Sequence, residues 1–349
     1  MAWNDGDTLD PALQRYSRQV LFDKIGPRGQ KSINLARVAL VGCGALGTVL
    51  ANTLVRAGVG FTRIIDRDFI EIDNLQRQVL FDESDIAANL PKAEAAARKL
   101  HRVNSAVEVE PVVEDISSAN IERLCGDVDL LLDGTDNLET RYLINDLAVK
   151  LNVPWVYGAC VAADGLVMAI IPGKTACLRC VWDEPPPPGA GETCDTVGVL
   201  SPIVNIVASF QAQEALKLLC GRTDDVIRSL MTIDAWSGRV RLVDVGAARP
   251  DCRCCAERKF DFLAGERTAG STTLCGRNAV QISPGGDSVV DFKSIAARLS
   301  RWRPVTNEFM LKVTIDEHAI TLFRDGRAII KGTSDVTAAR AIYAKYIGT

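Results

Sequence analysis

The sequence predicts an α/β fold in which a mostly parallel sheet carries helices on both faces, followed by a small C-terminal α+β domain. Short apolar runs of strand length alternate with longer helical patterns through most of the chain. A glycine-rich turn joins the first apolar run to the first helical pattern. Near the C-terminus, closely spaced short strands replace this alternation. The regular alternation is typical of βαβ units, whose strands pair in parallel.

The βαβ series starts with an apolar run at residues 37–41 and a helical pattern at 45–57. Further strand-like runs lie at 61–65, 107–113, 128–132, 155–157 and 161–171, with helical patterns at 93–100 and 140–151 between them. A helical pattern at 201–219 and a hairpin at 230–243 follow. These lengths are ordinary for the strands and helices of an α/β domain.

Small and polar residues replace the apolar pattern at 264–271, where we place a boundary between a large domain, residues 1–264, and a small one, residues 270–349. A chain of this length is too long for one small core. The small domain is predicted to contain strands at 279–282, 309–315, 319–323 and 328–330 and helices at 292–302 and 336–346. Its sequence indicates no chemistry of its own.

The composition excludes several classes of function. The 349 residues carry a net charge of −4, whereas a non-specific nucleic-acid binder needs a basic face. No run of about 18 apolar residues occurs, so we expect no membrane-spanning helix. Residues 1–10 are polar and unlike a secretory leader, and the 11 cysteines include CxxC pairs. We therefore expect a cytoplasmic protein with reduced thiols.

The glycine-rich turn Gly42-Cys-Gly44-Ala-Leu-Gly47 is typical of a Rossmann-like nucleotide site. It follows a predicted strand and opens a predicted helix, and Asp66 comes about 20 residues later, as the dinucleotide-type fingerprint requires. Gly42 and Gly44 let the backbone turn close to a phosphate, while Gly47 lets the helix pack on the strand. Asp66 can accept hydrogen bonds from ribose hydroxyls. Taken alone, this motif suggests NAD and a dehydrogenase.

The polar residues that follow Asp66 favour a triphosphate instead. Asp68, Asn74 and Arg77 come soon after it, and Lys92 opens the next predicted helix. Such charges would crowd a hydride-transfer cofactor. Asp136 directly follows a predicted strand, at the sheet edge where ligands bind in these folds. We expect the basic residues and a Mg²⁺ ion on this carboxylate to bracket the triphosphate of ATP.

Two cysteine pairs predict a structural zinc site. Cys177 and Cys180 are separated by two residues, as are Cys252 and Cys255. This spacing lets both sulfurs of a pair reach one tetrahedral Zn²⁺, and two pairs complete a closed site with no position for substrate. Cys254 is an alternative fourth ligand, but Cys255 repeats the spacing of the first pair, and we prefer it.

These motifs together resemble those of the ThiF/MoeB/HesA adenylyltransferases, relatives of the ubiquitin-activating enzymes. The resemblance covers about residues 12–262, and its motifs occur in family order: Arg15–Gln19, the glycine turn, Asn74–Gln78, Asp133–Asn137 and the two CxxC pairs. It implies that Mg-ATP activates the C-terminal glycine of a small ubiquitin-like sulfur carrier as an acyl-adenylate, with release of pyrophosphate. The carboxylate itself attacks the α-phosphorus, so no strong base is needed, in keeping with a chain that has 2 histidines.

The resemblance also implies roles for individual residues. Asp66 would bind ribose, Arg77 and Lys92 would contact phosphates, and Asp136 would hold Mg²⁺. Arg18, in the Arg15–Gln19 motif, would reach the phosphates of the partner subunit, because the family is similar in forming homodimers with shared sites.

Cys194 matches a loop cysteine that links covalently to the carrier in some family members, and an inert thiol is the alternative. The carrier would end in Gly-Gly, and a sulfurtransferase or cysteine desulfurase is a possible further partner. The sequence leaves open whether the carrier serves thiamine, molybdopterin or tRNA thiolation. Docking of the carrier and dimer packing are both possible roles for the small domain. A non-catalytic NAD(H)-binding or scaffold protein is the alternative function.

Overall fold

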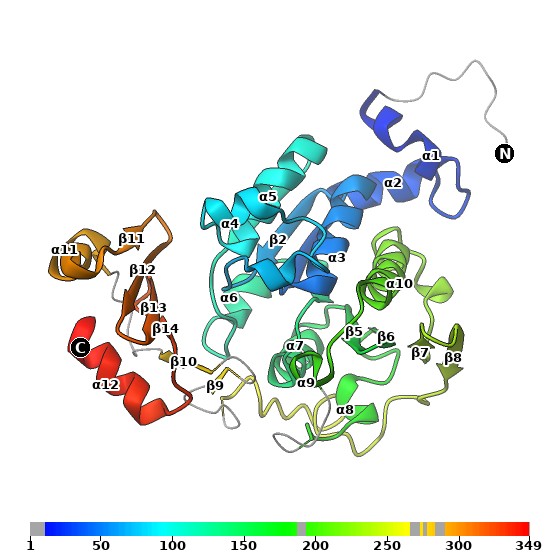
Figure 1. The fold of residues 1–349 in the computed structure, drawn as a ribbon. Helices are drawn as coiled ribbons and strands as arrows, with labels where there is room; N and C mark the ends of the chain where they lie inside the picture. The colour runs from blue at the N-terminus through cyan, green and yellow to red at the C-terminus, as the bar shows by residue number, and fades with distance from the viewer. Residues whose placement is uncertain (1–10, 187–192, 266–272, 275–277, 283–289, 349) are drawn as a thin grey trace. The chain divides into compact units, whose positions relative to one another are not determined.

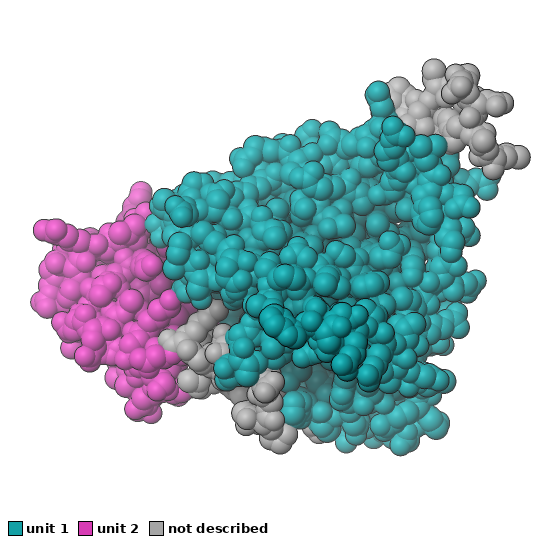
Figure 2. Space-filling model, turned by 45° about the vertical axis from the view of Figure 1, so that its right-hand side comes forward, with its two compact units in different colours: residues 1–267 teal, residues 268–349 magenta. Residues whose placement is uncertain are grey.

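The computed structural model describes residues 11–186, 193–265, 273–274, 278–282 and 290–348. The chain forms two compact units, residues 1–267 and residues 268–349 (Figure 2). Most of the domain boundary expected at 264–271 lies outside the described residues.

Unit 1 is built on an eight-stranded sheet within its described residues, in the order β3-β2-β1-β4-β5-β6-β7-β8. The strands are β1 Arg37–Val41, β2 Phe61–Ile65, β3 Glu108–Val112, β4 Leu130–Asp133, β5 Trp155–Val161, β6 Asp164–Ile170, β7 Leu230–Asp234 and β8 Arg239–Val243. Strands β1 to β5 pair in parallel, and β5 to β8 pair antiparallel. The parallel strands therefore end together at one carboxyl edge.

Helices cover both faces of this sheet (Figure 1). The main ones are α3 Ala45–Ala57, α5 Lys92–Val103, α6 Ile121–Cys125, α7 Leu138–Leu151 and α10 Ser201–Leu219. Side chains of α3, α5 and α10 share one buried core with one face of the sheet. Side chains of α6 and α7 share a second core with the other face and the cysteine-rich segments. This arrangement confirms the predicted α/β fold.

The N-terminal segment packs at the C-terminal end of α3. It contains the 3₁₀ helix η1 Pro11–Tyr16 and the helices α1 Ser17–Val20 and α2 Gly26–Leu35. Gln19 and Gln30 each donate a side-chain hydrogen bond to the carbonyl of Ala57, at 3.0 and 2.9 Å. Asn104 donates to the Tyr16 hydroxyl at 2.9 Å. These amide contacts fix the segment far from the glycine turn, which lies at the other end of α3.

Unit 2 has a six-stranded antiparallel sheet within its described residues, in the order β11-β12-β13-β14-β10-β9. Its strands are β9 Thr273–Leu274, β10 Ala279–Ile282, β11 Val305–Thr306, β12 Met310–Ile315, β13 His318–Phe323 and β14 Ala328–Lys331. The helices α11 Phe292–Arg298 and α12 Val336–Tyr346 share its one large apolar core. The helix expected at 292–302 ends at Arg298, and residues 300–302 form a 3₁₀ turn instead.

Candidate active site and cysteine cluster

The glycine turn lies between the carboxyl end of β1 and the first turn of α3. Gly42 has a φ of +91°, and a Cβ on it would lie 2.7 Å from the carbonyl oxygen of Gly134. A Cβ on Gly47 would lie 2.1 Å from the carbonyl oxygen of Gly42. At Gly44 the nearest atoms would be 4.0 Å away. Gly42 and Gly47 are therefore required by packing, whereas Gly44 leaves open space in front of the helix, where backbone N–H groups favour an anion.

This difference predicts opposite effects of two alanine substitutions. Gly47→Ala forces a methyl group into a backbone carbonyl, and we expect a loss of about 1–3 kcal/mol of stability, measured by urea denaturation. Gly44→Ala should leave the denaturation midpoint nearly unchanged but weaken ATP binding measured by calorimetry, because its methyl occupies the open space. Equal loss of stability in both variants would contradict the open space at Gly44.

Asp66 ties the end of β2 to the glycine turn. Its Oδ2 accepts a hydrogen bond from the backbone N–H of Cys43 at 2.6 Å, and its Oδ1 accepts one from Asp68 N–H at 2.7 Å. Burial raises the pKa of Asp66, and the nearby charge of Lys92 opposes that rise. Each carboxylate oxygen has a second lone pair, so the group can still accept from a ligand hydroxyl.

Lys92 brings a buried positive charge to the same edge. It is the first residue of α5, and its Nζ lies 3.2 Å from Oδ2 of Asp68. Its backbone N–H donates to the Asp68 carbonyl at 2.8 Å. Burial of the ammonium lowers the pKa of Lys92, but the negative charges of Asp68, Asp66 and Asp136 outweigh it, and the pKa is raised overall. The structure thus brings Lys92 and these three carboxylates together as one charged cluster.

Asn74 and Arg77 occupy a tight turn that follows Asp68 in the chain. Asn74 ends the short 3₁₀ helix η2 Ile72–Asn74, and its buried side chain accepts from Glu71 N–H at 3.1 Å. The Arg77 guanidinium donates to the carbonyl of Asp73 at 2.8 Å, within the same turn. Asn74 therefore holds the turn together, and the turn orients Arg77. The sequence alone does not distinguish this structural role of Asn74 from ligand binding.

Arg18 lies away from the glycine turn of its own chain. It is exposed and precedes Gln19, which bonds to the last residue of α3. The 13 residues of α3 separate that end from the glycine turn by about 20 Å at 1.5 Å per residue. An arginine side chain is much shorter than this, so Arg18 does not reach the glycine turn of its own protomer.

Four cysteine sulfurs converge beside α7. The Sγ atoms of Cys177, Cys180, Cys252 and Cys255 all lie within 4.8 Å of one another. The close pairs are 3.7 Å for Cys177–Cys180, 3.6 Å for Cys177–Cys252 and 3.4 Å for Cys180–Cys255. Tetrahedral zinc with bonds of about 2.3 Å needs sulfurs about 3.8 Å apart. Cys254 instead accepts a hydrogen bond from the Asn145 side chain at 3.2 Å. The donor set thus fits zinc with Cys255 as the fourth ligand.

Cys194 begins the one-turn helix α9 Cys194–Val197 and lies against the end of β5. Its thiol donates to the carbonyl of Cys160 at 3.1 Å. Burial, together with the nearby Cys194 sulfur, raises the pKa of Cys160 to about 12. The chain after α9 is held by Ala162, whose N–H donates to the Gly198 carbonyl at 2.9 Å. Cys194 is therefore partly exposed at the carboxyl edge of the sheet, the edge that carries the charged cluster.

A family model described as the ThiF family matches residues 16–254. This span is more than half of the chain and contains the glycine turn, the charged cluster and all but one of the converging cysteines. The chain belongs to the ThiF family. The resemblance that the ordered motifs predict is thereby confirmed.

Two relatives of this ThiF-family chain and one solved structure are similar to it. It is 44% identical to the sulfur carrier protein ThiS adenylyltransferase of Bacillus subtilis, with 96% of this chain and 99% of that protein covered. It is 37% identical to a sulfur carrier protein adenylyltransferase of Thermus thermophilus, with 70% of this chain and 91% of that protein covered. A solved structure of Escherichia coli MccB matches with a TM-score of 0.63 at 22% identity, over 72% of this chain and 76% of that one. At that identity the last likeness concerns the fold.

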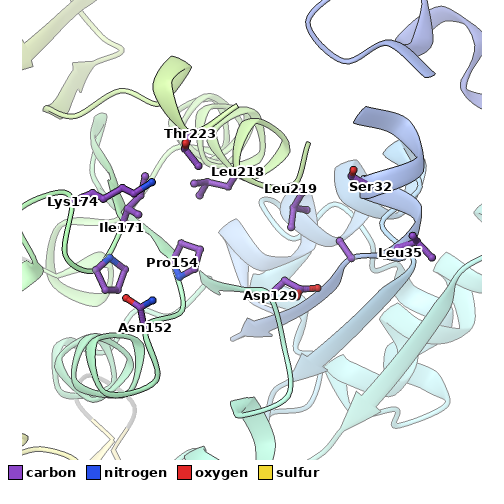
Figure 3. A pocket seen from close by; sticks show the side chains of 12 residues that line it. Ser32, Leu35, Asp129, Asn152, Pro154, Ile171, Lys174, Leu218, Leu219 and Thr223 are labelled. Atoms are coloured by element: carbon purple, nitrogen blue, oxygen red, sulfur yellow. The ribbon is translucent and has the colours of Figure 1, made fainter. Parts of the chain in front are cut away.

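The ThiF-family unit also has a cavity at the opposite, amino-terminal edge of its sheet (Figure 3). It has a volume of about 570 Å³ and is lined by Leu35, Pro154, Leu218 and other apolar residues, together with polar residues that include Lys174 and Asp129. It contains none of the predicted site residues.

Among the helices in the described part of the chain, none is long and apolar enough to cross a membrane.

Proposed function

We propose that this protein uses ATP to adenylylate the C-terminal glycine of a ThiS-type ubiquitin-like sulfur carrier, with release of pyrophosphate. The observation that carries the proposal is the 44% identity to the Bacillus subtilis ThiS adenylyltransferase over 96% of the chain. That match necessarily includes most of residues 268–349, which makes a ThiS-type carrier a better candidate than carriers of relatives that match only the first unit.

The carboxyl edge of the sheet supplies an ATP site of the right chemistry. The open space at Gly44 lets the triphosphate approach the first turn of α3. Asp66 accepts from the ribose hydroxyls with its remaining lone pairs. Lys92 exchanges part of its contact with Asp68 for a phosphate oxygen, and Arg77 swings from its turn to a second phosphate. These cations reduce repulsion between the triphosphate and the attacking carrier carboxylate.

Asp136 fits a Mg²⁺ ion carried by the nucleotide. It is exposed at the carboxyl edge, and its charge acts on Lys92 and thus lies in the same cluster. Magnesium typically binds one or two carboxylates together with substrate phosphates rather than an all-protein cage. When bound, the ion neutralises charge on the departing pyrophosphate. The carrier carboxylate attacks the α-phosphorus directly, so positioning and charge are the protein's main contributions.

The converging cysteines would hold a structural zinc ion. The four sulfurs of Cys177, Cys180, Cys252 and Cys255 would all bind the ion, which leaves no coordination position for substrate. Cys194 is the thiol we propose for a covalent link with the carrier, since it lies at the same sheet edge as the charged cluster. A sulfurtransferase or cysteine desulfurase would supply the sulfur. Unit 2 is proposed to dock the carrier or to extend a dimer.

The test uses purified protein with a carrier that ends in Gly-Gly. We expect exchange of labelled pyrophosphate into ATP that requires this carrier, and no exchange with a carrier that lacks its last glycine. The alternative, a non-catalytic NAD(H)-binding protein, should bind NAD(H) and show no exchange with any carrier.

We further propose that Arg18 acts across a homodimer interface, because it cannot reach the glycine turn of its own chain. An Arg18→Ala chain and an Asp136→Asn chain should each be inactive, whereas a mixture should recover part of the activity. Mixed dimers would contain one site with both lesions and one intact site. No recovery after subunit exchange, verified by mass spectrometry of the mixed dimer, would contradict the shared site.

A further inference from the structure

The ladder between β4 and β5 stops before the carboxyl edge. The two strands pair only at Leu131–Trp155 and Leu132–Val156. Beyond this point, buried side chains replace the backbone ladder. The amide of Gln211, from α10, donates to the carbonyls of Asp133 at 2.9 Å and Val156 at 3.3 Å. Polar side chains therefore set the distance between β4 and β5 where the two strands separate.

Arg141, from α7, forms the other half of this spacer. Its Nε donates to Oδ2 of Asp133 at 2.9 Å, and both side chains are buried. Its Nη2 donates to the carbonyls of Thr135 at 2.7 Å and Gly158 at 3.0 Å. The planar guanidinium thus joins three parts of the chain in one fixed geometry, which a lysine could not reproduce.

Asp133 also holds Thr135 in place by hydrogen bonds. Its Oδ1 accepts from the Thr135 N–H at 2.9 Å and from the Thr135 hydroxyl at 2.8 Å. On the other side of Asp136, Asn137 caps α7 by accepting from Glu139 N–H at 2.8 Å. The peptide units on both sides of Asp136 are therefore fixed, so its carboxylate projects from a rigid corner.

We propose that Arg141 and Asp133 are positioning residues that set the carboxylate of Asp136 for metal–nucleotide binding. This inference rests on the proposed function, because it assumes that Asp136 binds the ion carried by ATP. Groups that orient a metal ligand through its own backbone act as a supporting shell, and their replacement typically costs about 10–100-fold in metal affinity. Neither residue needs to touch the ion.

The charge of Arg141 is stable in this setting. Burial lowers the pKa of Arg141, but the negative charges of Asp133 and Asp136 and the nearby Tyr157 outweigh it, and the pKa is raised overall. Replacing a buried ion pair by apolar residues of similar size is often neutral or stabilising, so stability alone does not account for this pair. Removing one partner alone would leave an unpaired buried charge.

The test measures Mn²⁺ binding by electron paramagnetic resonance in the presence of a non-hydrolysable ATP analogue. Arg141→Lys should weaken Mn²⁺ binding about 10-fold or more while the protein stays folded. The double variant Asp133→Asn/Arg141→Met removes both charges without leaving one unpaired, and it should show the same weakening. The pair's loss should also raise the Mg²⁺ concentration needed for half-maximal exchange, with much of the rate restored at high Mg²⁺.

The control is Arg63→Lys. Arg63, in β2, forms an ion pair with Glu110 of β3 at 2.6 Å and another with Asp127, both partly exposed and away from Asp136. It should lose stability without any change in Mn²⁺ affinity. Unchanged Mn²⁺ affinity in both Arg141 variants would overturn the inference, even if the melting temperature falls. Failure of wild-type protein to show carrier-dependent exchange would instead contradict the proposed function, so the two failures are distinguishable.

Discussion

Asp136→Asn is expected to reduce carrier-dependent ATP–pyrophosphate exchange by about a hundredfold or more, because a charged partner of the transition state is lost. The neutral amide cannot balance Mg²⁺, and it also removes a negative charge that acts on Lys92. Arg77→Ala should cause a loss of similar size. The rates are measured with saturating carrier, and folding is checked by circular dichroism.

The matched control is Asp129→Asn, an exposed carboxylate at the amino-terminal edge of the same sheet. Its amide oxygen can still accept from the Arg37 N–H, as the carboxylate does at 2.8 Å. We expect exchange close to wild type. Near-normal exchange in Asp136→Asn would show that this carboxylate does not hold the metal.

Cys177→Ser is expected to lower zinc content and solubility together. A structural zinc site contributes on the order of 10 kcal/mol to local folding, and three sulfurs with one hydroxyl bind zinc far more weakly. The segments that carry the cysteines also form part of the second core of unit 1, so loss of the ion should expose apolar surface there. Zinc is measured by atomic emission and folding by thermal denaturation.

Two further variants separate the fourth ligand from its neighbour. Cys255→Ser should lose zinc as Cys177→Ser does, because its sulfur lies 3.4 Å from Cys180. Cys254→Ser should keep zinc, since its sulfur bonds to Asn145 instead. A folded, active protein that contains no metal would refute the structural role, and the reverse pattern for Cys254 and Cys255 would reassign the ligand.

The sequence was sufficient for the features that local rules determine. The period of apolar residues predicts the alternating strands and helices, and the need for a turn without side chains identifies Gly42 and Gly47. The helix predicted at 45–57 begins and ends at the residues found in α3. The spacing of Cys177 and Cys180 identifies a chelating pair, because two intervening residues place both sulfurs on one side of a turn.

Long-range polar contacts could not be predicted in the same way. Arg141 and Gln211 lie in helical patterns that show only apolar period, and nothing local indicates that they meet Asp133. Arg141 lies one helical turn after Asn137, but this spacing does not point to Asp133. The end of α11 at Arg298 likewise depends on packing in unit 2, since the helical pattern continues to Trp302.

The most direct measurement of the central claim is the mass of a ThiS-type carrier after incubation with this protein and Mg-ATP. The proposed function predicts a carrier heavier by one adenylyl group, sensitive to hydroxylamine, and formed only when the C-terminal glycine is present. Lys92→Met, which removes the buried cation of the cluster, should prevent its formation. An unmodified carrier in the presence of wild-type protein, with no pyrophosphate released, would contradict adenylylation as the activity of this chain.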